Sequence, residues 1–186
     1  ADHLGDQPPA YDADAFRADI ELIADCLRQS GFEEVAHTGR LHRLRVLAQT
    51  FGFHMAALDI RQHSGVLEEA LAQLLRRAGV TADYTALDEA DKRAILQAEL
   101  QNPRPLVSAT TELPDTAAQV MATFGVVRDI LREDPAAMGS FIVSMTHSVS
   151  DLLEPMLLAK EAGIGHGEDG RFACPIDFVP LFETID

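Results

Sequence analysis

Residues 58–67, LDIRQHSGVL, decide how this chain folds. They follow a run of apolar residues and precede a helical pattern, so a buried strand opens here into a helix. Arg61 and Gln62 therefore lie at a strand-to-helix junction, where α/β proteins place groups that hold anionic substrates. A second junction of this kind, VPLFET, spans residues 179–184. Together the two junctions predict a site that this chain contains only in part.

The composition is typical of a soluble globular protein. The 186 residues are 47% hydrophobic and 24% charged, which is ordinary for such a chain. Only 6% are aromatic and there is no Trp, so the core must be mostly aliphatic and rich in Ala, which favours helices. We expect a loose N-terminal segment over residues 1–11 and a single domain over residues 12–186.

The charge balance excludes several classes of partner. The formal net charge is -15, so the surface repels phosphate backbones and anionic lipid. This predicts no nucleic-acid partner and no membrane association. An anionic substrate would need a local basic pocket.

The sequence shows no signal peptide and no long apolar run, so we expect a cytoplasmic protein. Neither Cys26 nor Cys174 has the spacing of metal ligands. We therefore expect both thiols to be structural, with Cys26 in the core.

Three short apolar runs are predicted as strands, at residues 55–61, 140–146 and 176–182. Each internal strand leads into a helix, which is the alternation of a parallel sheet or barrel. The predicted fold is α/β with predominant α-helix: a partial (β/α) barrel of about three parallel strands surrounded by helices. Three strands cannot close a barrel. Because the chain begins without Met and stops after a strand-like run, we expect a piece of a larger enzyme.

Two local expectations concern the remaining segments. Thr85 and Asp88 have the spacing of a capping box for a helix that reaches about residue 100. Glu89 and Lys92 are expected on the exposed face of that helix. The glycines between residues 163 and 170 predict a flexible loop.

Arg61 and Glu183 are the candidate site residues. A guanidinium at the carboxyl end of a strand can donate two hydrogen bonds to a phosphate or carboxylate. The alternative for Arg61 is a salt bridge to Asp59 or Glu68. A carboxylate at Glu183 could bind a hard divalent ion, or it could stabilise the start of a following helix. His147 follows the second strand, and we assign it no role.

Several motifs resemble those of phosphoenolpyruvate carboxylase. Residues 51–62, FGFHMAALDIRQ, are similar to the family's FG and LDIRQ pattern. FIVSM at residues 141–145, SDLL at 150–153 and LLAKEAG at 157–163 resemble its ISM, SDVL and LLxKEAG segments, and VPLFET at residues 179–184 resembles another. The motifs occur in the family's order. Thr146 and His147 depart from the more usual Ala-Lys.

The resemblance implies a function for the parent protein. It would be an eight-stranded barrel enzyme, a homotetramer, that joins phosphoenolpyruvate to bicarbonate and releases oxaloacetate and phosphate with Mg²⁺ or Mn²⁺. Arg61 matches the family's arginine near the substrate phosphate, and Glu183 matches one of two carboxylate metal ligands. The second metal ligand would lie beyond Asp186, so the chain alone is expected to be inactive.

Two other readings remain open on the residues alone. One is a different barrel enzyme that uses phosphoenolpyruvate or pyruvate with Mg²⁺. The other is a non-catalytic helical interaction module, in which the helices between residues 85 and 133 form the binding surface. In that case Arg61 and Glu183 would be replaceable without loss of activity.

Overall fold

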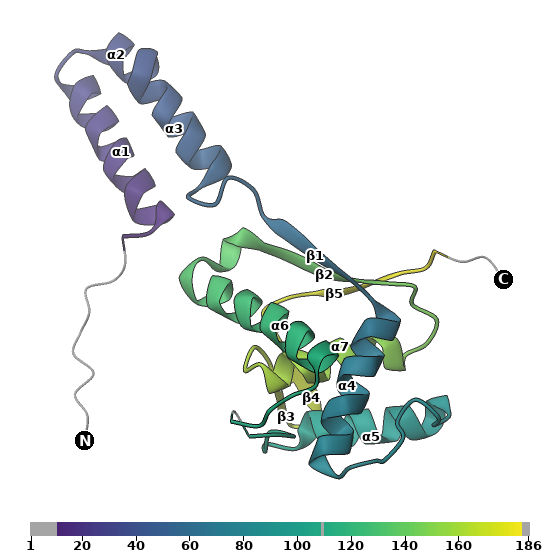
Figure 1. Ribbon diagram of the computed structural model, residues 1–186. Helices are drawn as coiled ribbons and strands as arrows, with labels where there is room; N and C mark the ends of the chain where they lie inside the picture. Colours follow the sequence, from purple (N-terminus) through teal and green to yellow (C-terminus); the bar gives the residue numbers. More distant parts are fainter. Residues whose placement is uncertain (1–10, 109, 184–186) are drawn as a thin grey trace, which may run out of the picture. The chain divides into compact units, whose positions relative to one another are not determined.

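The structure is a computed structural model that describes residues 11–108 and 110–183 (Figure 1). It divides into two compact units, of which the first ends at Ala56 and the second begins at Ala57. The expected loose segment, residues 1–11, lies outside the described residues except for Tyr11. The expectation of a single domain over residues 12–186 stays a prediction. Within the described residues, no helix is both long enough and apolar enough to cross a membrane.

The first unit consists of two long helices joined through a short one. The helices are α1 Ala13–Gln29, α2 Glu33–His37 and α3 Gly39–Phe51. α1 contacts α3, and Ile20, Ala24 and Ala48 are the residues of the two helices that are buried. Arg45 of α3 also donates its Nε–H to the Glu21 carboxylate of α1 over 2.8 Å. Small side chains allow helices to approach closely, so the Ala-rich composition suits this pairing.

Cys26 is exposed, so the prediction of a core thiol was wrong. The buried residues of α1 are Ile20 and Ala24, which lie four positions apart on one face. Cys26 lies two positions after Ala24, and two positions turn an α-helix by about 200°. Its thiol therefore lies on the opposite face. Cys174, in the second unit, is half-buried, and burial raises the pKa of its thiol, which suits a structural residue.

Three parallel strands form a sheet in the second unit, in the order β1-β2-β5. They are β1 Leu58–His63, β2 Met138–Ser144 and β5 Phe178–Leu181. The prediction of three parallel strands in a mostly helical chain is confirmed, with strand boundaries shifted by a few residues, and the partial barrel stays a prediction. β2 is the central strand, so β1 and β5 form the two edges of this sheet.

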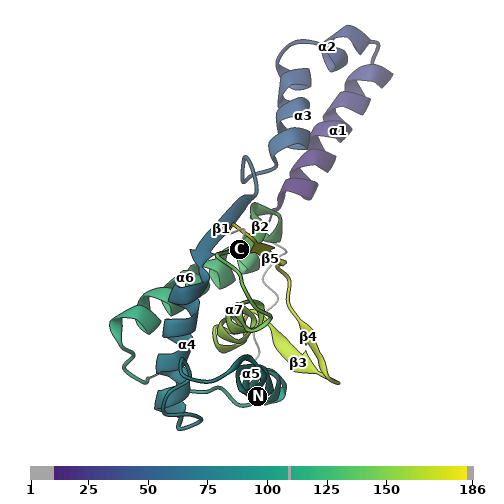
Figure 2. The same cartoon turned by 90° about the vertical axis from the view of Figure 1, so that its right-hand side faces the viewer.

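Helices pack against one face of the sheet (Figures 1 and 2). The helices of this unit are α4 Ser64–Ala78, α5 Glu89–Gln101, α6 Asp115–Glu133 and α7 Ser150–Glu161, with the 3₁₀ turn η1 Pro135–Ala137 before β2. α4, α6 and α7 contact β1, β2 and β5 respectively. Phe141 of β2 stacks on Phe124 of α6 with ring centres 5.0 Å apart, and lies 5.7 Å from Phe178 of β5. Burial of each such side chain contributes about 1.5–3 kcal/mol, so this row anchors the core.

The other face of the sheet is open. Side chains alternate between the two faces of a strand, so the face opposite Phe141 carries the row Arg61, Ile142 and Val179, which are paired across the three strands. Val179 is 40% exposed, whereas Phe141 is 1% exposed. Polar groups on this row can therefore meet a ligand without entering the core.

The segment predicted as a flexible loop contains part of a β-hairpin, so that prediction was wrong. β3 His166–Glu168 pairs antiparallel with β4 Arg171–Ala173. Gln101, at the end of α5, accepts a hydrogen bond from the Gly170 N–H (3.1 Å) and donates one to the Arg171 carbonyl (3.3 Å). The glycines favour a loop locally, but these bonds join residues about 70 positions apart and hold the hairpin to α5.

Helix α5 begins without the predicted capping box. Its cap is Asp88, whose Oδ1 accepts a hydrogen bond from the Asp91 N–H over 2.9 Å. Thr85 instead donates its hydroxyl to Asp83 over 3.0 Å. Asp is an effective cap by itself because its carboxylate also interacts favourably with the positive end of the helix dipole. The helix therefore starts at Glu89, four residues after Thr85.

We expect Gly167→Ala to destabilise the second unit by about 1–3 kcal/mol. A Cβ at Gly167 would overlap the backbone carbonyl of Leu100, which cannot rotate away as a side chain can. Gly125→Ala in α6 is the matched control, because no atom of the described residues outside its own helix turn lies within 4 Å of its Cβ position. Urea unfolding measures both variants. Equal midpoints for Gly167→Ala and the wild type would contradict this close approach of hairpin and helix.

Candidate active site

Arg61 and Glu183 lie in direct contact at the carboxyl edge of the sheet. The two residues are 122 positions apart in the chain, and Arg61 Nη2 lies 2.5 Å from Glu183 Oε1. Arg61 projects from β1, and Glu183 follows the end of β5 by two residues. Val179 pairs with Ile142 and Leu181 with Ser144, so alternation along β5 keeps Val179 and Leu181 on the open face that carries Arg61. The structure thus brings both predicted site residues together.

The contact between Arg61 and Glu183 is accessible to solvent. Their side chains are 55% and 33% exposed respectively. Exposed ion pairs of this kind contribute about 0–1 kcal/mol. The guanidinium can therefore exchange its carboxylate partner for a phosphate at little cost in free energy, and the carboxylate can turn towards a cation.

The two alternative partners of Arg61 are engaged elsewhere. Asp59 Oδ1 accepts a hydrogen bond from the Ser140 N–H over 2.8 Å. Glu68 forms an ion pair with Lys92. Arg61 does form a salt bridge, but its partner is Glu183 rather than Asp59 or Glu68.

Hydrogen bonds to the backbone fix the turn that follows β2. Met145 has a positive φ of 57°, which is uncommon for a residue with a side chain and costs about 1–3 kcal/mol. Ser64, the first residue of α4, donates its hydroxyl to the Met145 carbonyl over 2.7 Å. Thr146 donates its hydroxyl to the Val143 carbonyl (2.8 Å) and its N–H to the Leu181 carbonyl (3.3 Å). These contacts tie the carboxyl ends of the strands together.

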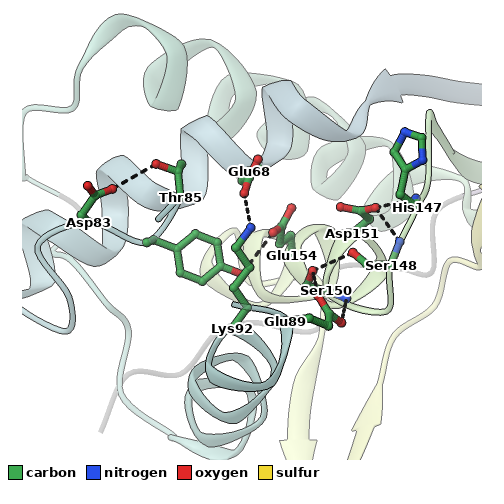
Figure 3. A network of polar contacts seen from close by, with 11 residues as sticks. Glu68, Asp83, Thr85, Glu89, Lys92, His147, Ser148, Ser150, Asp151 and Glu154 are labelled. Carbon is green, nitrogen blue, oxygen red and sulfur yellow. Dashed lines mark hydrogen bonds and ion pairs between the residues drawn. The ribbon is translucent and has the colours of Figure 1, made fainter. Parts of the chain in front are cut away.

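His147 lies at the same edge of the sheet and forms a hydrogen bond through its backbone N–H. Its N–H and that of Ser148 both donate to Asp151 Oδ2, over 2.7 and 2.9 Å (Figure 3). Asp151 is in the first turn of α7, so this carboxylate stabilises the entry to the helix.

A buried polar cluster between α4, α5 and α7 went unnoticed in the sequence. Glu154 of α7 is fully buried and accepts a hydrogen bond from the Tyr84 hydroxyl on Oε1 over 3.1 Å. Its Oε2 has no hydrogen-bond partner among the described residues. Burial raises the pKa of Glu154 to about 8, although the Tyr84 bond opposes this. The signal was the helical spacing, since Glu154 lies four positions from the buried residues Ser150 and Leu158.

Lys92 and Glu89 belong to this region rather than to a solvated face, which corrects the prediction for both. Lys92 pairs with Glu68 of α4 (Figure 3). Its Nζ also lies over the Tyr84 ring, 5.4 Å from the ring centre. Burial lowers the pKa of Lys92, but the hydrogen bond and charge of Glu68 outweigh it, so the pKa is raised overall. Glu89 accepts hydrogen bonds from the Ser150 N–H (3.1 Å) and hydroxyl (2.6 Å). These bonds join α5 to α4 and α7.

Glu183 is the candidate metal ligand among the described residues. Among them, no three His, Cys, Asp or Glu side chains gather closely enough to hold a metal ion. Glu183 supplies a hard oxygen ligand of the kind that Mg²⁺ and Mn²⁺ prefer, and Mg²⁺ is commonly held by only one or two carboxylates with water and substrate oxygens. Glu183 is therefore a chemically suitable ligand for either ion. The described residues do not supply the other ligands that a complete site needs.

Comparison with known proteins decides the family. A family model described as phosphoenolpyruvate carboxylase matches residues 2–186. The chain belongs to the phosphoenolpyruvate carboxylase family. The resemblance of the LDIRQ and VPLFET motifs is thereby confirmed at the level of the family. Membership counts against a helical interaction module unrelated to catalysis and against an unrelated barrel enzyme.

Individual relatives extend well beyond the matched region. The chain is 54% identical to a phosphoenolpyruvate carboxylase of Rhodothermus marinus over 185 residues, which is 96% of this chain and 20% of that protein. It is 41% identical to one of Ralstonia nicotianae, covering 99% of this chain and 19% of the relative. The match to one of Mycobacterium avium is also 41%, over 96% and 19%. The chain thus spans about one fifth of the length of these curated phosphoenolpyruvate carboxylases.

Proposed function

We propose that this chain is part of a longer phosphoenolpyruvate carboxylase, which joins phosphoenolpyruvate to bicarbonate and releases oxaloacetate and phosphate. The observation that carries the proposal is the contact between Arg61 and Glu183 at the carboxyl edge of the sheet, in a chain of this family. In barrel enzymes this edge is where substrates bind. Arg61 comes from the LDIRQ motif and Glu183 from the VPLFET motif, both of which resemble motifs of the family.

Arg61 would bind the phosphoryl group of phosphoenolpyruvate. Its guanidinium is permanently charged and presents several N–H donors in one plane, which suits the oxygens of a phosphate. A fixed positive charge also stabilises the negative charge that builds up as the phosphoryl group passes to bicarbonate. Because the chain carries a net charge of -15, a local cation of this kind is needed to offset repulsion of the anionic substrate.

Glu183 would hold Mg²⁺ or Mn²⁺ together with ligands from other parts of the longer protein. When bound, such an ion supplies a Lewis acid for the enolate oxygen. In the chain by itself Glu183 pairs with Arg61, so each group neutralises the other until substrate and cation separate them. The open face must also be closed off from water, because water would protonate the enolate.

The remaining features of the proposed parent follow from the family resemblance. Its barrel would have eight strands, of which β1, β2 and β5 are three. The parent would be a cytoplasmic homotetramer without a nucleic-acid or membrane partner. The 186-residue chain would be inactive alone, since it offers one metal carboxylate and one substrate arginine.

Glu183→Ala in the full-length carboxylase is expected to lower oxaloacetate formation by about 10²-fold or more, because a metal ligand is lost. A coupled oxaloacetate assay with phosphoenolpyruvate, bicarbonate and Mg²⁺ measures it. The matched control is Glu133→Ala, at the exposed end of α6, which should keep full activity. Wild-type activity in folded Glu183→Ala would remove Glu183 from the metal site. A folded wild type that forms no oxaloacetate would defeat the proposed reaction itself.

A further inference from the structure

The pairing of β1 with β2 contains a β-bulge just before Arg61. Leu58 pairs with Met138, but Ile60 pairs with Phe141, so two steps along β1 match three steps along β2. Asp59 therefore lies opposite two residues of β2, Gly139 and Ser140. Bulges bend a strand and change the direction of the side chains that follow. This one lies two residues before the guanidinium that we propose binds phosphate.

Asp59 compensates for the interruption in the strand pairing. The N–H of Phe141 points towards the β5 side and donates to the carbonyl of Asp177, the residue before β5, over 2.8 Å. Because successive N–H groups of a strand point in opposite directions, the Ser140 N–H points towards β1. There it finds the Asp59 side chain, whose Oδ1 accepts it over 2.8 Å. The carboxylate thus takes the place of the missing backbone acceptor.

Gly139 leaves the space in which the Asp59 carboxylate lies. A Cβ at Gly139 would overlap Asp59 Oδ1 and would lie 3.3 Å from the Leu58 carbonyl oxygen. Any residue other than Gly at this position must displace the Asp59 side chain. The Asp59 carboxylate on β1 can therefore bind here only because Gly139 on β2 has no side chain.

The bulge determines which face of the sheet Arg61 occupies. If pairing ran on from Leu58 and Met138 without the extra residue, Arg61 would lie opposite Phe141, three steps further on each strand. Phe141 points into the helix-covered core. With the bulge, Arg61 lies opposite Ile142, on the open face where Glu183 meets it. A shift of one residue exchanges the two faces of a strand.

We propose that Asp59 and Gly139 are positioning residues for Arg61: they hold the bulge that keeps its guanidinium on the open face at the carboxyl edge. The inference rests on the proposed phosphate-binding role of Arg61. Neither residue needs to touch the substrate. Their effect on the reaction passes through Arg61, and this separates them from residues that only stabilise the fold.

A mutant cycle in the full-length carboxylase tests the pair. Asp59→Ala and Gly139→Ala should each lower kcat/KM for phosphoenolpyruvate by about 10–100-fold, since a displacement of about 1 Å costs that much. Asp59→Asn keeps Oδ1 and should stay within about threefold of the wild type. The double variant should resemble Asp59→Ala alone, because the space that the new Cβ needs is then vacant. Gly125→Ala serves as the control for the glycine substitution.

A second cycle separates positioning from stability. In an Arg61→Ala background, adding Asp59→Ala should cause no further loss of kcat/KM, because the group that Asp59 positions is gone. A further tenfold loss would overturn the inference, as would normal activity in Asp59→Ala beside an inactive Arg61→Ala. Full activity in Arg61→Ala would overturn the proposed function and this inference together. If the losses of kcat/KM for Asp59→Ala and Gly139→Ala multiplied in the double variant, the two residues would not act as a pair.

Discussion

Arg61→Ala in the full-length carboxylase is expected to lower kcat/KM for phosphoenolpyruvate by about 10³-fold, which corresponds to about 4 kcal/mol of transition-state stabilisation. The guanidinium lies at the carboxyl edge of the sheet with its side chain 55% exposed, so a substrate can reach it. Its removal takes away both the donors to the phosphate and the positive charge. A coupled oxaloacetate assay over a range of phosphoenolpyruvate concentrations measures the loss.

The variant Arg61→Lys refines this test. Lys keeps the charge but cannot donate from a planar fork, so we expect an intermediate loss of about 10–10²-fold. The Arg61 variants should fold normally, because an exposed ion pair contributes about 0–1 kcal/mol. Arg93→Ala, on the exposed side of α5, is the control for loss of an arginine. If Arg61→Ala and Arg93→Ala were equally active, Arg61 would have no part in binding phosphate.

In the wild type, ionisation of Glu154 is expected to lower the free energy of unfolding by about 2–4 kcal/mol at pH 8. Glu154→Gln is expected to remove this loss. Burial raises the pKa of Glu154 from 4.5 to about 8. Below pH 4.5 the carboxyl group is protonated in both the folded and the unfolded chain. Between pH 4.5 and 8 the folded chain keeps a proton that the unfolded chain has released, so stability falls as pH rises. Above pH 8 the loss is complete.

Urea unfolding of the wild type and Glu154→Gln at pH 5, 6, 7 and 8 checks this prediction. Glu154→Gln should be the more stable protein at pH 8. This advantage should shrink or reverse towards pH 5, because Gln places an amide in a site that has no second hydrogen-bond partner among the described residues. Taking the difference cancels the titration of the histidines, which the two proteins share. Glu133→Gln, at the exposed end of α6, should keep the wild-type profile. Parallel profiles for the wild type and Glu154→Gln would show that Glu154 is ionised at little cost.

Much of the local structure could be predicted because it depends on neighbours in the chain. The helices α1, α3, α4, α6 and α7 follow apolar spacing, and the strand runs are short and rich in apolar residues. The family motifs identified both Arg61 and Glu183 as candidates. The errors at Cys26, Thr85 and the hairpin that begins at His166 arose because each pattern is consistent with two structures. For the hairpin, hydrogen bonds to the distant helix α5 selected one of them.

The sequence by itself determined most of the helices, the three strands of the parallel sheet, the family and the two candidate site residues, because these depend on residue type and short spacing. Only the tertiary structure decided that Arg61 meets Glu183, since this requires the strand order β1-β2-β5 to bring together residues 122 positions apart. It also decided the face that Arg61 occupies and the burial of Glu154. Strand order and register arise from contacts between distant segments, and such contacts leave no periodic pattern in the sequence.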